Sequence, residues 1–421
     1  MADTATMSAA MKTKFLGPVR DNLHSGFVLL YGGDSGNPEG FQGITSSAEN
    51  IDFVGNEVRT PLLAKRSSGI GFRNENDTLP EADASEFTYI SEPQRHAYGV
   101  FSITGQLMKA SESSEGAFKS AFKQEMEHLT LSSKIDMNRA AFGNGVGVLA
   151  TVSANEAAGQ TVISVDTTIN FRTGEMIDGL TIATGVVIEP ARKVTAVDRT
   201  NLTITVTPAL TTGLTASTDG WVRSSSNSTV AVPNNSWNRE IQGLSSIVAA
   251  TGTLHGVSPT SYPFWASTVV PSAGAISDTL LDTAMDNVGF ESGKGEAGGT
   301  DFVLMTTRGI RRRYKDTLTS MKRFTEAKPV KLNGGFTAVM FNENPIFVDD
   351  YCPVGNVFGL RPASLAWSQM SDWDWMDQDG AVLKQVSGKD KYQAILFKYC
   401  NLLTTARNEH FRLTGVTDDA K

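Results

Sequence analysis

The stretch from Glu115 to Phe142 constrains this chain most, because it predicts one long helix. Its apolar residues recur at steps of four, four and three, so they share one face of a 3.6-residue repeat, and that face must be buried: Phe118, Phe122, Met126 and Leu129. The glycines at positions 143, 145 and 147 then end the helix, since glycine accepts a left-handed conformation. At 1.5 Å per residue such a helix is about 40 Å long. Residues 111–148 therefore form an axis along which the rest of the chain must be arranged.

Composition sets further bounds. The chain has 421 residues, of which 40% are hydrophobic and 19% charged, which is enough for a buried core in two or three lobes. The apolar runs fall short of the roughly 18 residues of a membrane span, and Phe27 to Tyr31 is too short for a signal-peptide core. Cys352 and Cys400 are the only cysteines, so we expect free thiols in a reducing, cytosolic compartment. A net charge of -8 argues against tight electrostatic binding to nucleic acid.

The sequence of the N-terminal part predicts extended segments that lie on the surface of another domain or subunit. Residues 1–56 are rich in Gly, Ser, Asn and Thr and predict an extended arm. In residues 57–110, Val58 to Leu63 and His96 to Met108 predict the two strands of a long hairpin. The polar stretch between them, from Lys65 to Ser91, predicts a weakly hydrophobic loop that reaches outward to a partner. Its charged candidates for contact with another subunit are Lys65, Arg66, Arg73, Glu75, Asp77 and Glu81.

After the helix the pattern changes to short strands. Residues 149–224 predict a compact all-β insert of sandwich or barrel type, in which Leu202 to Thr207 alternates apolar residues with threonines. Residues 225–345 are mixed, with helices predicted at Asp278 to Val288 and near Arg308 to Leu318. Residues 346–421 are mostly strands. The overall fold class is therefore α+β.

The candidate nucleotide-binding and metal-binding motifs of the sequence are incomplete. The glycines at 143, 145 and 147 follow a helix, whereas a dinucleotide fingerprint follows a strand and opens a helix. Gly293 and Lys294 resemble part of a phosphate loop, but Val288 stands at its first glycine and Gly295 at its hydroxyl residue. The five histidines are scattered and are expected to make ordinary polar contacts. We therefore expect no catalytic residue, cofactor or metal ion.

Two charged clusters remain as candidates for contacts between subunits. Four aspartates between positions 372 and 379 surround Trp373 and Trp375, and they lack the alternation and terminal glutamate of a calcium loop. This cluster predicts a solvated or inter-subunit loop with tryptophan anchors. The densest basic run is on a helix whose buried side is predicted to be Ile310, Tyr314 and Leu318, which turns the run toward solvent or subunit ion pairs: Arg311, Arg312 and Arg313.

The order of these parts resembles the major capsid protein of tailed bacteriophages, with the fold named after phage Hong Kong ninety-seven. The resemblance covers nearly the whole chain. It rests on patterns whose order is more specific than any one of them: Leu79 to Met108 running into the Phe118 to Phe142 helix, Gly243 to Val270 with Thr253-Leu254-His255-Gly256-Val257 and Trp265, Asp301 to Leu318, and Phe336 to Leu360 with Pro345-Ile346-Phe347-Val348-Asp349-Asp350.

The resemblance implies a fold and a role. The hairpin would be the extended loop, the helix the spine of the peripheral domain, residues 225–345 the axial domain and residues 346–421 strands of both, with residues 149–224 as an inserted accessory domain. The subunit would assemble with itself, as pentamers and hexamers, into an icosahedral virion shell around double-stranded DNA in the bacterial host cytoplasm. Its other partners would be portal and scaffolding proteins and a cement protein, with no membrane. Some members cross-link a lysine of this loop, but Lys65 lacks a matching asparagine and is expected to be a plain ion-pair partner.

Two other functions stay open at this point. An encapsulin-type compartment shares the fold and would enclose cargo protein instead of DNA. A β-rich adhesin or glycan-binding module could be built on residues 149–224, although such a protein would be expected to carry an export signal.

Overall fold

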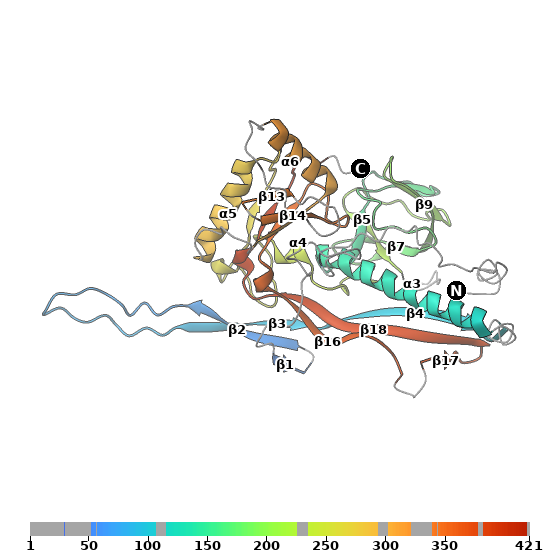
Figure 1. Ribbon diagram of the computed structural model, residues 1–421, viewed down its shortest axis with the longest axis horizontal. Helices are drawn as coiled ribbons and strands as arrows, with labels where there is room; N and C mark the ends of the chain where they lie inside the picture. The colour runs from blue at the N-terminus through green and yellow to red at the C-terminus, as the bar shows by residue number, and fades with distance from the viewer. Residues whose placement is uncertain are drawn as a thin grey trace.

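The computed structural model describes residues 29, 52–55, 57–106, 115–224, 235–293, 302–320, 339–342, 344–377 and 382–418. Figure 1 shows a long platform of strands with helix α3 lying along it, and two lobes standing on the same side as the helix. A hairpin leaves one end of the platform and extends far beyond the lobes. The long helix lies between the platform and the lobes (Figure 1).

Helix α3 spans Glu115–Phe142, which confirms the predicted helix. Met126 and Leu129 are partly buried against Phe101 and Ala394 of the platform, as their shared face requires. The side chains of Phe118 and Phe122 lie outside the described residues. Toward its C-terminal end the helix is buried on nearly all sides, where it enters the largest core of the protein: Ile135, Met137, Ala140, Ala141 and Phe142.

The platform has one central strand, β18, which pairs with β4 on one side and with β16 and β17 on the other. Its members are β4 (Arg95–Thr104), β16 (Leu365–Trp375), β17 (Lys384–Gln385) and β18 (Lys391–Thr404). The prediction of a loop around Trp373 and Trp375 is wrong, because both lie in β16. The tryptophans alternate with Asp372 and Asp374, so the aspartates point to solvent while the rings are half-buried.

The extended hairpin consists of β2 (Glu57–Lys65) and β3 (Glu86–Pro93), with β1 (Asp52–Val54) beside β2. The prediction that His96 to Met108 forms its second strand is therefore wrong. One residue, Gln94, separates β3 from β4, and its Nε2 donates to Ser368 Oγ at 2.6 Å. The chain thus passes almost directly from pairing with β2 to pairing with the long strand β18, which offers a ten-residue ladder.

The predicted N-terminal arm is described only at Leu29 and in residues 52–55. Leu29 is fully buried in the core that holds the end of α3, and its amide donates to Asp349 Oδ2 at 3.1 Å. This residue is therefore fixed on its own subunit. The remainder of residues 1–56, apart from β1 and Gly55, lies outside the described residues, so the arm stays a prediction.

Residues 148–223 form a six-stranded antiparallel sheet with a core of its own, centred on Trp221, Ile177 and Val194. The predicted strand from Leu202 to Thr207 is confirmed as β9. The strands are β5 (Val148–Thr151), β6 (Val162–Ser164), β7 (Met176–Thr181), β8 (Val187–Asp198), β9 (Thr203–Thr207) and β10 (Asp219–Arg223).

The other lobe is built on a mixed six-stranded sheet in the order β11-β19-β15-β12-β14-β13. One face packs on α5 (Asp278–Ser292) and α6 (Arg308–Ser320), and the other on the end of α3 and on α4 (Leu244–Ile247). The strands are β11 (Thr268–Val270), β12 (Val303–Thr306), β13 (Val339–Phe341), β14 (Asn344–Val348), β15 (Val357–Leu360) and β19 (Phe411–Leu413). Three single-turn 3-10 helices complete the described elements: Pro263–Trp265, Pro362–Ser364 and Arg407–Glu409.

Gly243 makes the close approach between α4 and the end of α3 possible. A Cβ at this position would lie 2.4, 2.6 and 2.8 Å from the carbonyl oxygens of Gly143, Ala140 and Ala141. We expect Gly243→Ala to lower the free energy of unfolding by about 3 kcal/mol, because these backbone atoms cannot move aside cheaply. Urea denaturation would measure this loss. Gly252→Ala, at a left-handed but open position, should cost only about 1 kcal/mol, and equal losses in the two variants would contradict the steric explanation.

Candidate subunit interfaces

The loop between β2 and β3 is braced at its base by one carboxylate. Asp83 accepts hydrogen bonds from the Ser68 amide at 2.9 Å, the Ser68 hydroxyl at 2.5 Å and Lys65 Nζ at 3.0 Å. The hydrogen bonds from Ser68 and then from Lys65 hold the pKa of the Asp83 carboxyl well below its usual range. The prediction that Lys65 is a plain ion-pair partner is confirmed, and the partner is in its own loop.

Farther out, the loop is tied to itself by side chains that bond to nearby backbone. Arg73 Nε donates to the Thr78 carbonyl at 3.1 Å, and the Asn74 amide donates to Asp77 Oδ2 at 3.0 Å. The other three predicted contact residues of the loop are exposed: Arg66, Glu75 and Glu81. The loop therefore keeps a defined shape while most of its surface faces solvent.

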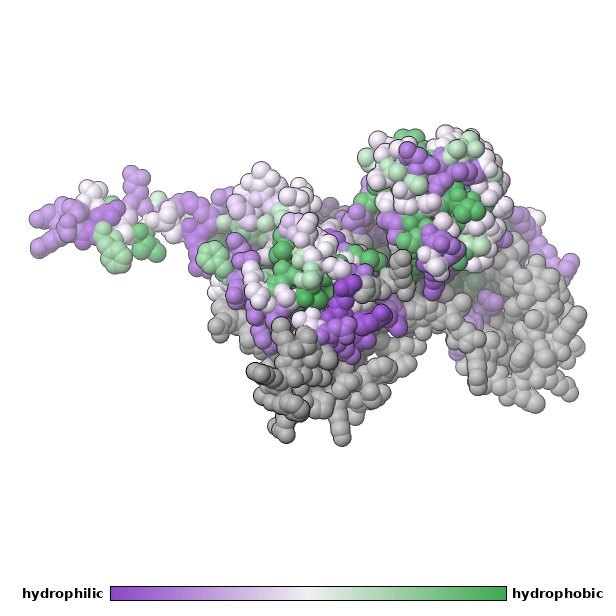
Figure 2. Space-filling view, turned by 90° about the horizontal axis from the view of Figure 1, so that it is seen from above, coloured by the Kyte–Doolittle hydropathy of each residue, from purple (hydrophilic) through white to green (hydrophobic). Residues whose placement is uncertain are grey.

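Sequence reasoning missed the apolar residues of this loop. Ile70, Phe72 and Leu79 are 87%, 101% and 78% exposed, so they pack on almost nothing within the described part of the subunit. Figure 2 shows hydrophobic atoms in green close to the end of the extended hairpin, among purple hydrophilic ones. The sequence did contain a sign of this surface, because Ile70 and Phe72 are two apolar residues spaced two positions apart in a polar stretch. Exposed apolar side chains at the end of a projecting loop are typical of a surface that another molecule covers.

The predicted basic helix is confirmed as α6. Ile310 and Tyr314 are fully buried and Leu318 packs beside them, so the arginines lie around the remaining faces. Arg312 is exposed, while Arg311 and Arg313 are partly buried. At the start of the helix, Arg308 forms a bidentate pair with Asp350, with Nε and Nη2 both at 2.5 Å from a carboxylate oxygen. Burial and the nearby charge of Arg308 lower the pKa of Arg311.

Both predicted tryptophan anchors contact their own subunit. Trp375 meets Phe101 edge to face at 5.7 Å between ring centroids, and Trp373 lies 5.8 Å from Lys398 Nζ. The Lys398 ammonium is buried and donates to Asp372 at 2.7 Å. These contacts join β16 to the platform beneath α3. Whether the exposed edges of the rings also meet a neighbouring subunit stays a prediction.

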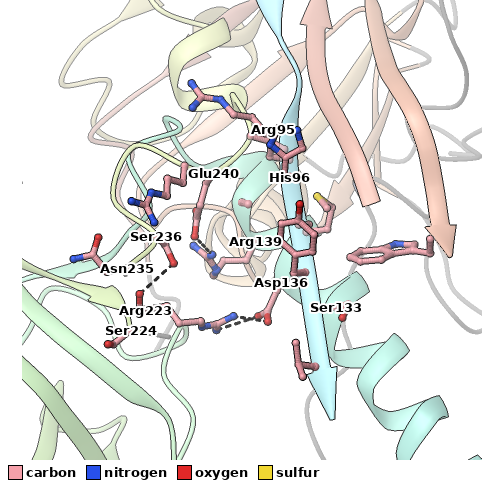
Figure 3. A pocket seen from close by; sticks show the side chains of 18 residues that line it. Arg95, His96, Ser133, Asp136, Arg139, Arg223, Ser224, Asn235, Ser236 and Glu240 are labelled. Atoms are coloured by element: carbon pink, nitrogen blue, oxygen red, sulfur yellow. Dashed lines mark hydrogen bonds and ion pairs between the residues drawn. The ribbon is translucent and has the colours of Figure 1, made fainter. Parts of the chain in front are cut away.

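A polar junction attaches the β-rich lobe to α3 (Figure 3). It borders a cavity of about 630 Å³ lined by α3, β4, the end of β10 and residues 235–241. Asp136 of α3 pairs with Arg172 at 3.1 Å and with Arg223 at 2.5 Å, and Arg139 pairs with Glu240. Burial opposes ionisation of Asp136, but the charges of Arg223 and Arg172 outweigh it and hold its pKa below the usual value. These ion pairs hold the β-rich lobe on α3. The sequence does not reveal them, because the paired residues are far apart in the chain.

Among the residues that the structure describes, the buried histidines and cysteines lie apart from one another in separate contacts. Among the described residues, no three His, Cys, Asp or Glu side chains are placed to hold a metal ion. His255 contacts Glu92 through Nδ1 at 3.0 Å, and the buried His410 ring accepts from the Arg361 amide at 3.3 Å, so both make the ordinary polar contacts predicted. Cys352 and Cys400 are free and buried, and burial raises the pKa of the Cys400 thiol to about 12. In the described part of the chain, no helix is long and apolar enough to cross a membrane.

The fold of this chain was compared with the folds and sequences of known proteins. No protein-family model and no curated protein sequence matches the chain. The structure is similar to a capsid subunit of cyanophage A-1(L), with a TM-score of 0.55 at 13% identity over 96% of this chain and 98% of that chain. Weaker likenesses are to the capsid of cyanophage P-SCSP1u (TM-score 0.46, 7% identity, 97% and 93% covered) and of the native GTA particle (TM-score 0.44, 10% identity, 98% and 99% covered).

The likeness to the cyanophage A-1(L) subunit extends over nearly the full length of both chains. It shows that this α+β chain has the fold of a bacteriophage capsid protein. The predicted resemblance is thus confirmed at the level of the fold.

Proposed function

We propose that this chain is the major capsid protein of a tailed bacteriophage, a structural subunit without catalytic activity. The observation that carries the proposal is the β2–β3 hairpin, whose loop is internally braced and yet presents Ile70, Phe72 and Leu79 to solvent. A lone subunit gains no stability from these side chains, whereas a neighbouring copy can bury them. The capsid-protein fold supports the same conclusion.

In this proposal the hairpin is the extended loop, α3 is the spine of the peripheral domain and the lobe with α5 and α6 is the axial domain. Residues 149–224 are an inserted accessory domain, and residues 1–56 are an arm. Pentamers and hexamers close an icosahedral shell around double-stranded DNA, with portal and scaffolding proteins and, outside, a cement protein as partners. The net charge of -8 supports enclosure without tight binding, because a surface that repels phosphates lets DNA enter and leave. Assembly takes place in the cytoplasm of the bacterial host.

The test is negative-stain electron microscopy of the purified recombinant chain, together with its sedimentation profile. We expect closed shells or ring-shaped capsomers. A chain that stays monomeric alone and also when co-expressed with the scaffolding protein of its phage would contradict the proposal. Particles that contain a protein cargo instead of DNA after production in infected cells would indicate a compartment shell.

A further inference from the structure

Helices α5 and α6 carry opposite charges. The sequence of α5 contains four acidic residues and no basic one, whereas α6 contains five basic residues and one acidic one. On α5 the buried side is formed by Leu281, Ala284, Met285 and Val288, so the opposite side faces solvent. That exposed side is the acidic face of α5: Asp282, Asp286, Phe290 and Glu291.

The basic face of α6 is defined in the same way. Because Ile310 and Tyr314 are buried, the residues on the far side of the helix point to solvent. The basic face consists of Arg308, Arg312 and Lys315. All three are exposed, and Arg308 forms an ion pair with Asp350 of its own subunit.

The two helices cover the same face of the sheet and turn their exposed sides in different directions (Figure 1). In the strand order β11-β19-β15-β12-β14-β13, α5 packs on β11 and β19 and α6 packs on β14. Figure 1 shows the two helices on different sides of the lobe, with α5 at its outer flank and α6 at its top. Tyr314 Oη donates to Asp278 Oδ1 at 2.8 Å and joins the two helices. Asp282 accepts a hydrogen bond from Asn342 Nδ2 at 2.9 Å, so Asp286 and Glu291 are the acidic residues of this face farther from α6 along α5.

We infer that the acidic face of α5 in one copy docks on the basic face of α6 in the next copy, in a head-to-tail contact. The inference rests on the proposed function, since it requires that copies of this chain associate. Two complementary patches on different sides of one subunit form a heterologous interface, and repetition of such an interface generates a ring when the rotation closes. Charge complementarity selects the partner, because any contact between like faces would place similar charges together. Phe290, which is 85% exposed within the acidic face, adds an apolar centre to the contact.

Paired charge reversals test this contact. One variant carries Asp286→Lys and Glu291→Lys, the other Arg312→Glu and Lys315→Glu, all at positions exposed on their helices. Each variant should fold normally and should need a concentration at least about tenfold higher for half-maximal assembly, because like charges then face each other. Lys193→Glu with Arg199→Glu, on the exposed surface of β8 and the turn after it, makes the same charge change as the Arg312 and Lys315 variant at another place and should assemble like the unaltered chain.

Mixing the two variants distinguishes a contact between copies from a general charge effect. In a six-membered ring where the two variants alternate, every acidic surface again meets a basic one, so a 1:1 mixture should form hexamers where neither variant does alone. A five-membered ring cannot alternate, so the recovery is measured as hexamers and not as closed shells. A chain carrying all four reversals should also assemble. Variants that assemble like the unaltered chain, or a mixture that fails to recover, would overturn the inference while leaving the proposed function intact. Failure of the unaltered chain to assemble under any condition would instead overturn the proposed function.

Discussion

Replacing Arg407 by methionine is expected to lower the free energy of unfolding by about 4 kcal/mol or more, since several buried carbonyls lose their donors at once. Arg407 is 1% exposed, and the groups that accept from its guanidinium in the described part of the chain are backbone carbonyls. Burial lowers the pKa of its guanidinium to about 10, so the group remains charged at neutral pH. Its nitrogens donate at 2.9 to 3.3 Å to five backbone carbonyls, those of Ser246, Ile247, Thr251, Gly252 and Trp265.

Urea denaturation of the unassembled subunit would measure the effect. Arg407→Lys keeps the charge but supplies three donors from one atom, so it should recover only a small part of the loss. Arg199→Met, at an exposed turn, is the control for removing an arginine and should change stability by less than about 0.5 kcal/mol. If Arg407→Met and Arg199→Met were equally stable, the carbonyl cluster would not depend on the guanidinium.

Nothing in the sequence around Arg407 marks it as buried. All five of its acceptors are more than a hundred positions away, so only the folded chain brings them together. The same holds for Asp136, whose partners Arg172 and Arg223 come from the β-rich lobe. Sequence patterns describe local periodicity, and these polar groups are defined by long-range topology.

Where the periodicity is strong, the elements were predictable. Helix α3 has the predicted bounds, and the buried side of α6 is the one its spacing indicates. The strand containing Trp373 and Trp375 was also readable, since tryptophans and aspartates alternate there, but the acidic composition suggested a loop. The strand partner of β2 was not readable, because both β3 and β4 have strand-like sequences and only the position of β18 decides between them.

Changing Ile70, Phe72 and Leu79 together to serine is expected to abolish assembly while leaving a folded subunit. The three side chains are almost fully exposed, so their loss removes no contact within the subunit and should leave the thermal midpoint unchanged within error. In an assembled shell each buried apolar side chain of this size contributes about 1.5 to 3 kcal/mol, so each copy would lose about 5 kcal/mol or more of contact energy. Sedimentation velocity would show the chain as free subunits at concentrations where the unaltered chain forms particles.

The matched control is Val162→Ser with Val186→Ser, which removes exposed apolar side chains from the β-rich lobe and should leave assembly unchanged. Comparison of the loop variant with this control shows whether assembly depends on where an exposed apolar side chain lies or only on how many the surface carries. If the loop variant assembled as readily as the control, the hairpin would not be the element that joins neighbouring copies. The exposed residues of the loop would then need another explanation, because an apolar group held out on a braced hairpin is a liability unless another surface covers it.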